Sequence, residues 1–174
     1  NLSDINITAS PIAIGRLHDS PETPFFLLSF ISGTTYDSLN EVSFEELRSL
    51  KESLELLSRQ KSLDLPKYDG PLDYLATFHH RAITHSKQSK TSGEILELVS
   101  SSSTLYPSIE TEINSIRSWS GKVMHGDLWM PNIIFQKGHK VILLDLESCA
   151  FGEPLYDLAY LLEASEGHSI DRFL

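Results

Sequence analysis

The 174-residue sequence predicts an α+β fold in which helices predominate and short strands occur in two places. Apolar runs at residues 11–15 and 24–31 predict two N-terminal strands. Leucines at three- and four-residue spacing after Ser43 predict a helix. Two further β-branched runs, at residues 132–136 and 140–144, flank a Lys-Gly-His turn and predict a β-hairpin.

The second N-terminal strand has an unusual composition. Residues 24–31 read Pro-Phe-Phe-Leu-Leu-Ser-Phe-Ile, which is apolar throughout, as in a strand that is buried on both faces. A polar turn at residues 18–21 joins this strand to residues 11–15, and Ser32-Gly33 allows a sharp bend after it. We therefore expect a buried strand that leads into a bend.

The central part of the sequence predicts helices. Ser43 and Glu46 form a capping-box pattern at the start of the first one, whose apolar stripe is Leu47, Leu50, Leu54 and Leu57. Further helices are expected over residues 72–87, over residues 107–116 after Pro107, and over residues 155–163. The protein should therefore be mainly helical between its two groups of strands.

Composition and charge exclude several classes of function. Fourteen basic and 24 acidic residues give a net charge of −10, which argues against nucleic-acid binding through a basic face. The same charge is compatible with a cationic substrate. No apolar run approaches the ~20 residues of a membrane span, and the first residues do not resemble a signal peptide. A single cysteine, Cys149, excludes an intrachain disulfide, so a reducing cytoplasm is the expected compartment.

The most informative residues lie around the predicted hairpin. If Gln136 faces Lys140, then Asn132 lies opposite Leu144, and Asp145 follows at once. Directly opposed residues of antiparallel strands are about 4.5–5.5 Å apart, so Asn132 and Asp145 can bind the same cation.

Asp127 lies one loop before this pair, in the segment His125-Gly126-Asp127. Transfer of a phosphate from ATP needs a base for the attacking hydroxyl and oxygen ligands for Mg²⁺, and these three residues would supply both. A His-Gly-Asp turn or an Asp after a strand is usually structural when it occurs alone. A site is indicated because all three residues occur together and the hairpin register brings Asn132 and Asp145 to the same end.

Three motifs resemble the aminoglycoside phosphotransferase and choline kinase group. They are His125-Gly126-Asp127-x4-Asn132, the Leu-Asp-Leu-Glu of residues 144–147, and the Gly-Glu-Pro-Leu-Tyr-Asp-Leu-Ala of residues 152–159. The resemblance runs from about Pro24 to the C-terminus. It implies a two-lobed, protein-kinase-like fold, in which residues 1–33 are the end of the small lobe and the hinge. Residues 34–174 would be the large lobe, incomplete at its C-terminus.

The resemblance also implies roles for individual residues. Asp127 corresponds to the catalytic base, and Asn132 and Asp145 correspond to the Mg²⁺ ligands. His125 and Asp157 would hold the catalytic loop without taking part in the chemistry. Protein kinases have Arg at the position of Gly126, Lys at that of Trp129 and Gly at that of Glu147, and these departures favour a small-molecule kinase.

The same resemblance places the adenine of ATP between the two lobes. Leu28 would lie at the back of the adenine pocket, with the Ser29 carbonyl and the Ile31 amide at the adenine edge. Ile134 and Leu144 would form the floor of the pocket. The alternative for residues 24–31 is an ordinary core strand without a role in nucleotide binding.

The parts of a kinase that hold the phosphates do not appear in this sequence. No G-x-G-x-x-G pattern, strand lysine or helix glutamate is found. We therefore expect either a fragment of a longer kinase or a truncated gene product, with weak activity on its own. The expected function is ATP- and Mg²⁺-dependent phosphorylation of an alcohol group on a small molecule that is aminoglycoside-like, choline-like or a glycated amine. The alternative is a catalytically inactive kinase-like module kept for binding or assembly.

Overall fold

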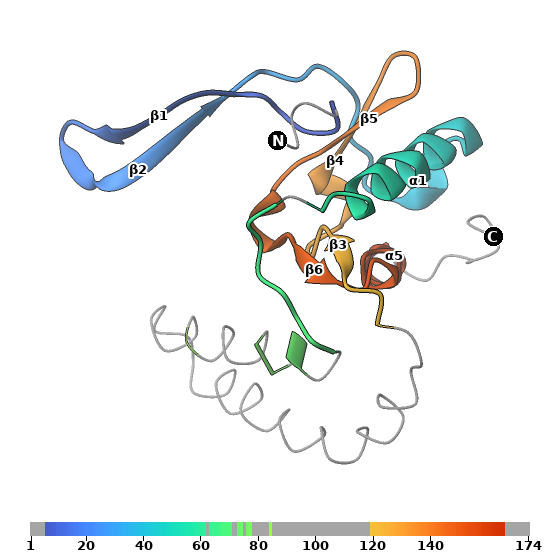
Figure 1. The fold of residues 1–174 in the computed structure, drawn as a ribbon. Coiled ribbons are helices and arrows are strands. Elements are labelled where there is room, and N and C mark those ends of the chain that lie inside the picture. The colour runs from blue at the N-terminus through green and yellow to red at the C-terminus, as the bar shows by residue number, and fades with distance from the viewer. Residues whose placement is uncertain are drawn as a thin grey trace, which may run out of the picture.

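The computed structural model describes residues 6–61, 63–70 and 119–165, together with positions 73, 74, 76, 77 and 84. The strands pair into three two-stranded antiparallel sheets, β1–β2, β3–β6 and β4–β5 (Figure 1). The strands are β1 (Pro11–Leu17), β2 (Ser20–Leu28), β3 (Lys122–Met124), β4 (Ile133–Gln136), β5 (Lys140–Leu143) and β6 (Ala150–Gly152). Within the described residues, the α-helices with defined bounds are α1 (Phe44–Ser58) and α5 (Leu155–Ala164), and the 3-10 helices are η2 (Leu39–Glu41), η4 (Met130–Asn132) and η5 (Leu146–Ser148).

These elements confirm the α+β class. The helix expected at residues 155–163 is present as α5. The helix expected at residues 107–116 lies outside the described residues, and of the one expected at residues 72–87 only five positions are described. None of the helices in the described part of the chain is long and apolar enough to cross a membrane.

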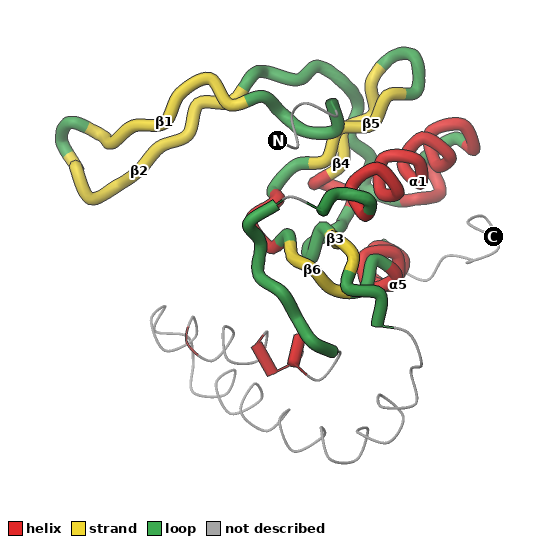
Figure 2. The backbone as a smooth tube through the Cα atoms, viewed as in Figure 1, coloured by secondary structure: helices red, strands yellow, loops and turns green. Residues whose placement is uncertain are grey.

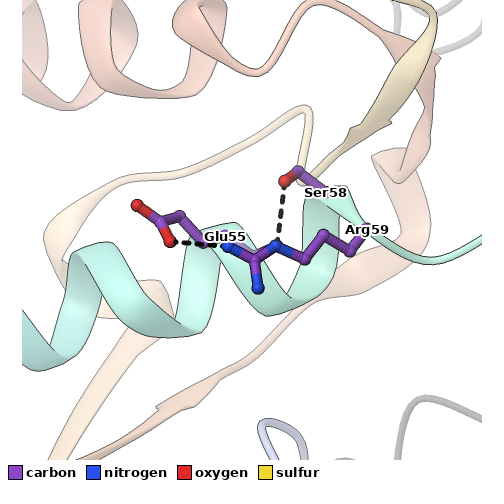
Figure 3. Close-up of polar contacts among 3 residues, drawn as sticks. All are labelled: Glu55, Ser58 and Arg59. Atoms are coloured by element: carbon purple, nitrogen blue, oxygen red, sulfur yellow. Dashed lines mark hydrogen bonds and ion pairs between the residues drawn. The ribbon is translucent and has the colours of Figure 1, made fainter.

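Helix α1 begins and packs as its sequence predicts. The Ser43 hydroxyl accepts a hydrogen bond from the Glu46 amide at 3.3 Å, and the Ser43 amide donates to the Glu46 carboxylate at 2.9 Å, which completes the capping box. At the other end of α1, the exposed guanidinium of Arg59 donates to the Glu55 carboxylate at 3.2 Å (Figure 3). Such exposed pairs one turn apart stabilise a helix only slightly, so burial of the leucine stripe holds α1 in place.

The main core lies between α1, the β4–β5 hairpin, β3 and α5. Its fully buried members come from each of these elements and from the loop between β3 and β4: Leu50, Leu57, Val123, Leu128, Ile133, Leu143 and Leu161. Cys149 is also buried in this core, and burial raises the pKa of its thiol to about 12, so it is a packing residue and not a nucleophile. The loop before β4 is therefore anchored in the core at both ends.

The β1–β2 hairpin forms an arm that reaches away from the other elements (Figures 1 and 2). The expectation of a buried second strand is wrong. Phe26, Leu27 and Leu28 of β2 are 65%, 51% and 50% exposed, and β2 spans residues 20–28 instead of 24–31. In the described part of the chain β2 pairs only with β1, and no second layer covers either face of the hairpin. The composition of β2 is therefore that of a buried strand, although its apolar side chains are exposed.

Both ends of this arm attach to the β4–β5 sheet. The Ile7 carbonyl accepts a hydrogen bond from the Leu143 amide at 2.7 Å, which adds the N-terminal segment beside β5. Thr34 and Phe135 exchange two backbone hydrogen bonds of 2.8 and 2.9 Å, which adds the segment after the arm beside β4. The arm is thus joined at both edges to the hairpin that carries the predicted site residues.

Candidate active site

The predicted register of the β4–β5 hairpin is confirmed. Gln136 pairs with Lys140, and the Leu144 amide donates a hydrogen bond to the Asn132 carbonyl at 2.8 Å. Asn132 therefore lies opposite Leu144, and Asp145 is the next residue along the chain. The structure brings the amide and the carboxylate to the same end of the hairpin.

Asp145 has an unusual backbone conformation. Its φ and ψ angles of 54° and 60° are left-handed, which is uncommon for a residue other than glycine. The side chain is exposed and does not cap η5, the short helix that begins at the next residue. A strained conformation that presents a free carboxylate is typical of functional sites, where it costs about 1–3 kcal/mol.

Asp157 connects helix α5 to the loop that contains Asp127. Its buried carboxylate accepts hydrogen bonds from the backbone amides of His125 and Gly126, at 2.7 and 2.8 Å. Burial raises the pKa of this carboxyl to about 6, although the two amide bonds oppose the shift. The contact that was expected between Asp157 and this loop is present.

Gly126 is the residue that this loop geometry requires. Its φ angle is +84°, a region that residues with side chains rarely adopt. A Cβ atom at this position would also overlap the carbonyl oxygen of Ser148. The glycine at this position, where protein kinases have arginine, therefore follows from the close approach of the loop to residue 148.

His125 links the same loop to the end of β5. Its buried ring donates from Nε2 to the Leu144 carbonyl at 2.8 Å, and its Nδ1 accepts from the Asp127 amide at 3.3 Å. A single neutral tautomer satisfies both contacts. Burial lowers the pKa of the ring, although the Leu144 carbonyl and the nearby carboxylates of Asp127 and Asp145 oppose the shift. Because both nitrogens are engaged within the protein, the ring holds the loop and is not placed to transfer a proton.

Asn132 holds the backbone of Asp127 from the other side. Its side-chain nitrogen donates to the Asp127 carbonyl at 3.0 Å, and the residue is almost completely buried. The nitrogen is thereby used within the protein, and the amide oxygen is left as the atom available to a ligand.

One residue near Asp127 was missed from the sequence. Burial raises the pKa of the Tyr160 phenol, and the negative charge of Asp127 raises it further. The available signal was its spacing, since a residue three positions after Asp157 lies on the same side of α5.

The fit of a metal ion can be judged from the oxygen ligands. In the described part of the chain no group of three or more His, Cys, Asp or Glu side chains is arranged to hold a metal ion. Asn132 and Asp145 offer one amide oxygen and one carboxylate. Mg²⁺ commonly binds to one or two carboxylates and completes its shell with water and phosphate oxygens. The pair therefore fits a Mg²⁺ that arrives with a nucleotide better than a metal held by protein alone.

The residues expected around adenine lie on two segments. Leu28, Ser29 and Ile31 are at or just after the end of β2, while Ile134 and Leu144 belong to the β4–β5 hairpin. The Ser29 amide donates to the Ser10 carbonyl at 2.8 Å, while the Ser29 carbonyl and the Ile31 amide have no hydrogen-bond partner in the described chain. A Cβ at Gly33 would overlap the Ile134 side chain and would lie 2.7 Å from the Phe135 carbonyl, so the segment after the arm packs directly against β4.

The apolar side chains there are only partly covered. Ile31, Ile134 and Leu144 are half-buried, and Leu28 is half exposed. Partly covered apolar groups beside free backbone donors and acceptors are the usual lining of a small-molecule site.

Comparison with known proteins gives a consistent result. The sequence model of the phosphotransferase enzyme family matches residues 4–173. A search of curated proteins finds no significant match.

Several solved structures share the fold. The choline kinase LicA from Streptococcus pneumoniae is 18% identical, with a TM-score of 0.68, over 99% of this chain and 56% of its own. A GDP complex of a mutant aminoglycoside 2'-phosphotransferase IIIa is 17% identical, with a TM-score of 0.60, over 92% and 57%. A ternary complex of aminoglycoside phosphotransferase APH(4)-Ia with ADP and hygromycin B is 14% identical, with a TM-score of 0.60, over 88% and 54%. The chain thus has a protein-kinase-like fold and spans just over half the length of these structures.

Proposed function

Because the chain belongs to the phosphotransferase enzyme family, we propose that it carries the phosphate-transfer site of an ATP- and Mg²⁺-dependent kinase for small-molecule hydroxyls. The observation that supports this most directly is the pair of short hydrogen bonds from the loop amides of His125 and Gly126 to the Asp157 carboxylate. This contact, together with the His125 ring, holds Asp127 near the end of β5, next to Leu144 and the following residue, Asp145. A base and a metal-binding carboxylate are thereby held on one rigid framework.

Asp127 is the proposed base. Its backbone is fixed on both sides, by the His125 ring at its amide and by the Asn132 side chain at its carbonyl. The carboxylate is half-buried, so it remains accessible to a hydroxyl from solvent. In this proposal it accepts the proton of the attacking hydroxyl, and positioning of that hydroxyl supplies most of the rate enhancement.

Asn132 and Asp145 are the proposed Mg²⁺ ligands. Bound Mg²⁺ would neutralise the charge that develops on the phosphate oxygens during transfer. The Asp145 carboxylate makes no capping hydrogen bond to η5, and the Asn132 side chain donates its nitrogen to Asp127, which leaves its oxygen available. Both side chains are thus kept ready for a ligand.

The nucleotide would lie against the base of the arm. Ile134 and Leu144 form the proposed floor below the adenine and Leu28 the back of the pocket. The Ser29 carbonyl can accept from the adenine amino group, and the Ile31 amide can donate to a ring nitrogen. The lack of protein partners for these two groups within the described chain supports this assignment.

The acceptor is proposed to be a cationic small molecule with a hydroxyl group. The chain carries a net charge of −10, and the site surface includes the exposed carboxylates of Asp145 and Glu147. A negative surface of this kind raises the local concentration of a cationic acceptor. Choline, aminoglycosides such as hygromycin B and glycated amines have this chemistry.

Transfer of radiolabelled phosphate from ATP to choline, hygromycin B and a glycated lysine by the full-length protein tests the proposal. We expect Mg²⁺-dependent labelling of at least one acceptor and its loss in Asp127→Ala and Asp145→Asn. Asp64→Asn is the matched control, because Asp64 is an exposed carboxylate to which the proposal assigns no role. Nucleotide binding without transfer to any acceptor would favour the alternative, a catalytically inactive kinase-like module.

A further inference from the structure

A cavity outside the proposed active site lies between α1, the start of β3 and the start of α5. Its volume is about 260 Å³, slightly less than the ~300–1,000 Å³ of most small-molecule sites. Its apolar lining consists of Leu54 of α1, and of Pro154, Leu155 and Leu158 at the start of α5. We call it the α1–α5 cavity, and its size and lining suit a short apolar chain.

Glu153 joins two walls of this cavity. One oxygen of its carboxylate accepts a hydrogen bond from the Ser120 amide at 3.0 Å, and the other accepts from the Leu155 amide at 3.3 Å. The Ser120 hydroxyl also donates to the Gly152 carbonyl at 3.3 Å. These hydrogen bonds tie the segment before β3 to the first turn of α5, so this side of the cavity is built into the fold.

Two lysines line the same cavity, Lys51 of α1 and Lys122 of β3. Both residues are exposed. Among the residues that the structure describes, neither lysine makes an ion pair or a hydrogen bond through its ammonium group. Each therefore has three donors available to a ligand.

The two glutamates of the lining do not cancel the charge of these lysines, because both already have donors. Glu55 accepts from the Arg59 guanidinium at 3.2 Å (Figure 3), and Glu153 accepts from the two backbone amides. The charge that remains available at the mouth of the cavity is positive. An acidic group is its natural complement.

We propose that the α1–α5 cavity binds a small amphipathic anion, a carboxylate on a short alkyl chain. The acidic group lies between the two lysines, and the alkyl chain packs against the leucines and the proline. This site is separate from phosphate transfer, because none of the residues that line it has a role in the proposed function.

Isothermal titration calorimetry of the full-length protein with octanoate, octylamine and acetate tests both parts of the proposal. Octylamine keeps the chain and reverses the charge, whereas acetate keeps the carboxylate without the chain. We expect octanoate to bind at one site per protein and at least about tenfold more tightly than either of the others. From butanoate to hexanoate the affinity should rise about fourfold for each CH₂ that is buried.

Substitutions locate the binding site. Lys51→Gln and Lys122→Gln should each weaken octanoate binding about two- to fivefold, which is the range for an exposed ion pair. Lys61→Gln is the matched control, because Lys61 is exposed but does not line the cavity, and it should leave the affinity unchanged. Leu155→Ser should reduce the gain for each CH₂, since Leu155 is part of the apolar wall.

Three results would overturn the proposal. Equal affinities for octanoate and octylamine would show that the lysines do not select an anion. An unchanged octanoate affinity in both lysine variants would place the binding elsewhere. No binding to the full-length protein would show that the cavity does not receive such a ligand. Since binding is measured without turnover, failure of the proposed function would leave this test unaffected.

Discussion

Replacement of Asp157 by asparagine tests the contact that holds the catalytic loop. The two side chains have nearly the same shape, so no cavity is created. The carboxylate accepts two amide hydrogen bonds, from His125 at 2.7 Å and Gly126 at 2.8 Å, whereas the asparagine side chain has only one acceptor oxygen. One loop amide would therefore lose its partner and face an NH₂ group, which costs about 1–3 kcal/mol.

The effect of Asp157→Asn on stability should depend on pH. In the unfolded chain this carboxyl ionises near its ordinary pKa of 3.8, while burial raises its pKa to about 6 in the folded protein. Between these values the folded state binds more protons than the unfolded state. The stability contribution of Asp157 is therefore fully present below pH 3.8 and is lost as the pH rises through 6. Between pH 5 and pH 7.5 the loss should be roughly 1–2 kcal/mol.

His125 contributes to the pH dependence of stability with the opposite sign. Burial lowers its pKa below 6.5 in the folded protein, so its contribution is present above pH 6.5 and is lost as the pH falls. The pH profile of the wild type contains both effects. The difference between the wild type and Asp157→Asn isolates the carboxyl group, because His125 is present in both proteins.

Urea unfolding at pH 5, 6 and 7.5 measures this difference, with Asp64→Asn as the control for loss of an exposed carboxylate. We expect Asp157→Asn to be less stable than the wild type at every pH. The difference should be larger at pH 5 than at pH 7.5 by roughly 1–2 kcal/mol, because at pH 7.5 the wild type must bury an ionised carboxylate and the variant buries no charge. A destabilisation that is the same at all three values would refute the raised pKa. Wild-type stability at all three values would refute the importance of the amide contacts themselves.

Four further substitutions and one measurement on residues 1–174 test the rest of the site and the arm. Asp145→Asn should reduce phosphate transfer by orders of magnitude in a coupled ATP assay, while circular dichroism shows an intact fold, because the side chain is exposed. Asp127→Ala should lower kcat about 10²–10⁴-fold with little change in the KM for ATP, and an equal loss of both would contradict its role as the base. Gly126→Ala should destabilise the protein by at least about 1–3 kcal/mol in urea unfolding, because its φ of +84° and the facing carbonyl leave no room for a side chain. Residues 1–174 alone should turn over well below the usual ~1–100 s⁻¹ of kinases. The same chain should self-associate in sedimentation velocity runs, and Phe26→Lys should reduce that association, because Phe26 is 65% exposed on an open strand pair.

The hairpin could be predicted from the sequence because the position of its turn determines which residues of the two strands pair. Once Gln136 and Lys140 are placed on either side of a three-residue turn, the period of two along each strand leaves one position for Asn132. Local rules were also sufficient for the capping box of α1. Contacts at this range depend on spacing along the chain and not on how distant elements pack.

The contacts of Asp157 and Tyr160 depend on packing that local spacing does not determine. A carboxylate at a helix start predicts only a cap, and the resemblance to a family was needed to connect Asp157 with the loop. The spacing of Tyr160 from Asp157 indicates only a shared side of α5, and its approach to Asp127 depends on how α5 is rotated against the loop. That rotation is set by Leu161, which is fully buried in the core one residue later.

The exposed arm shows why composition alone gave the wrong burial for β2. Apolar composition shows that a strand can be buried, but burial also requires a layer of other residues over it. Phe26, Leu27 and Leu28 have no such covering layer in the described chain. The base of the arm behaves differently, since the segments at Ile7 and Thr34 add backbone hydrogen bonds to both edges of the β4–β5 sheet.

The segments that flank the arm and the β4–β5 hairpin, whose end lies beside the proposed Mg²⁺ ligands, are therefore joined by backbone hydrogen bonds. In such an arrangement, a change at the arm reaches Asn132 and Asp145 through two strands at once. Substitutions that weaken either junction should therefore disturb metal and nucleotide binding together, while those at Asp127 should affect transfer alone.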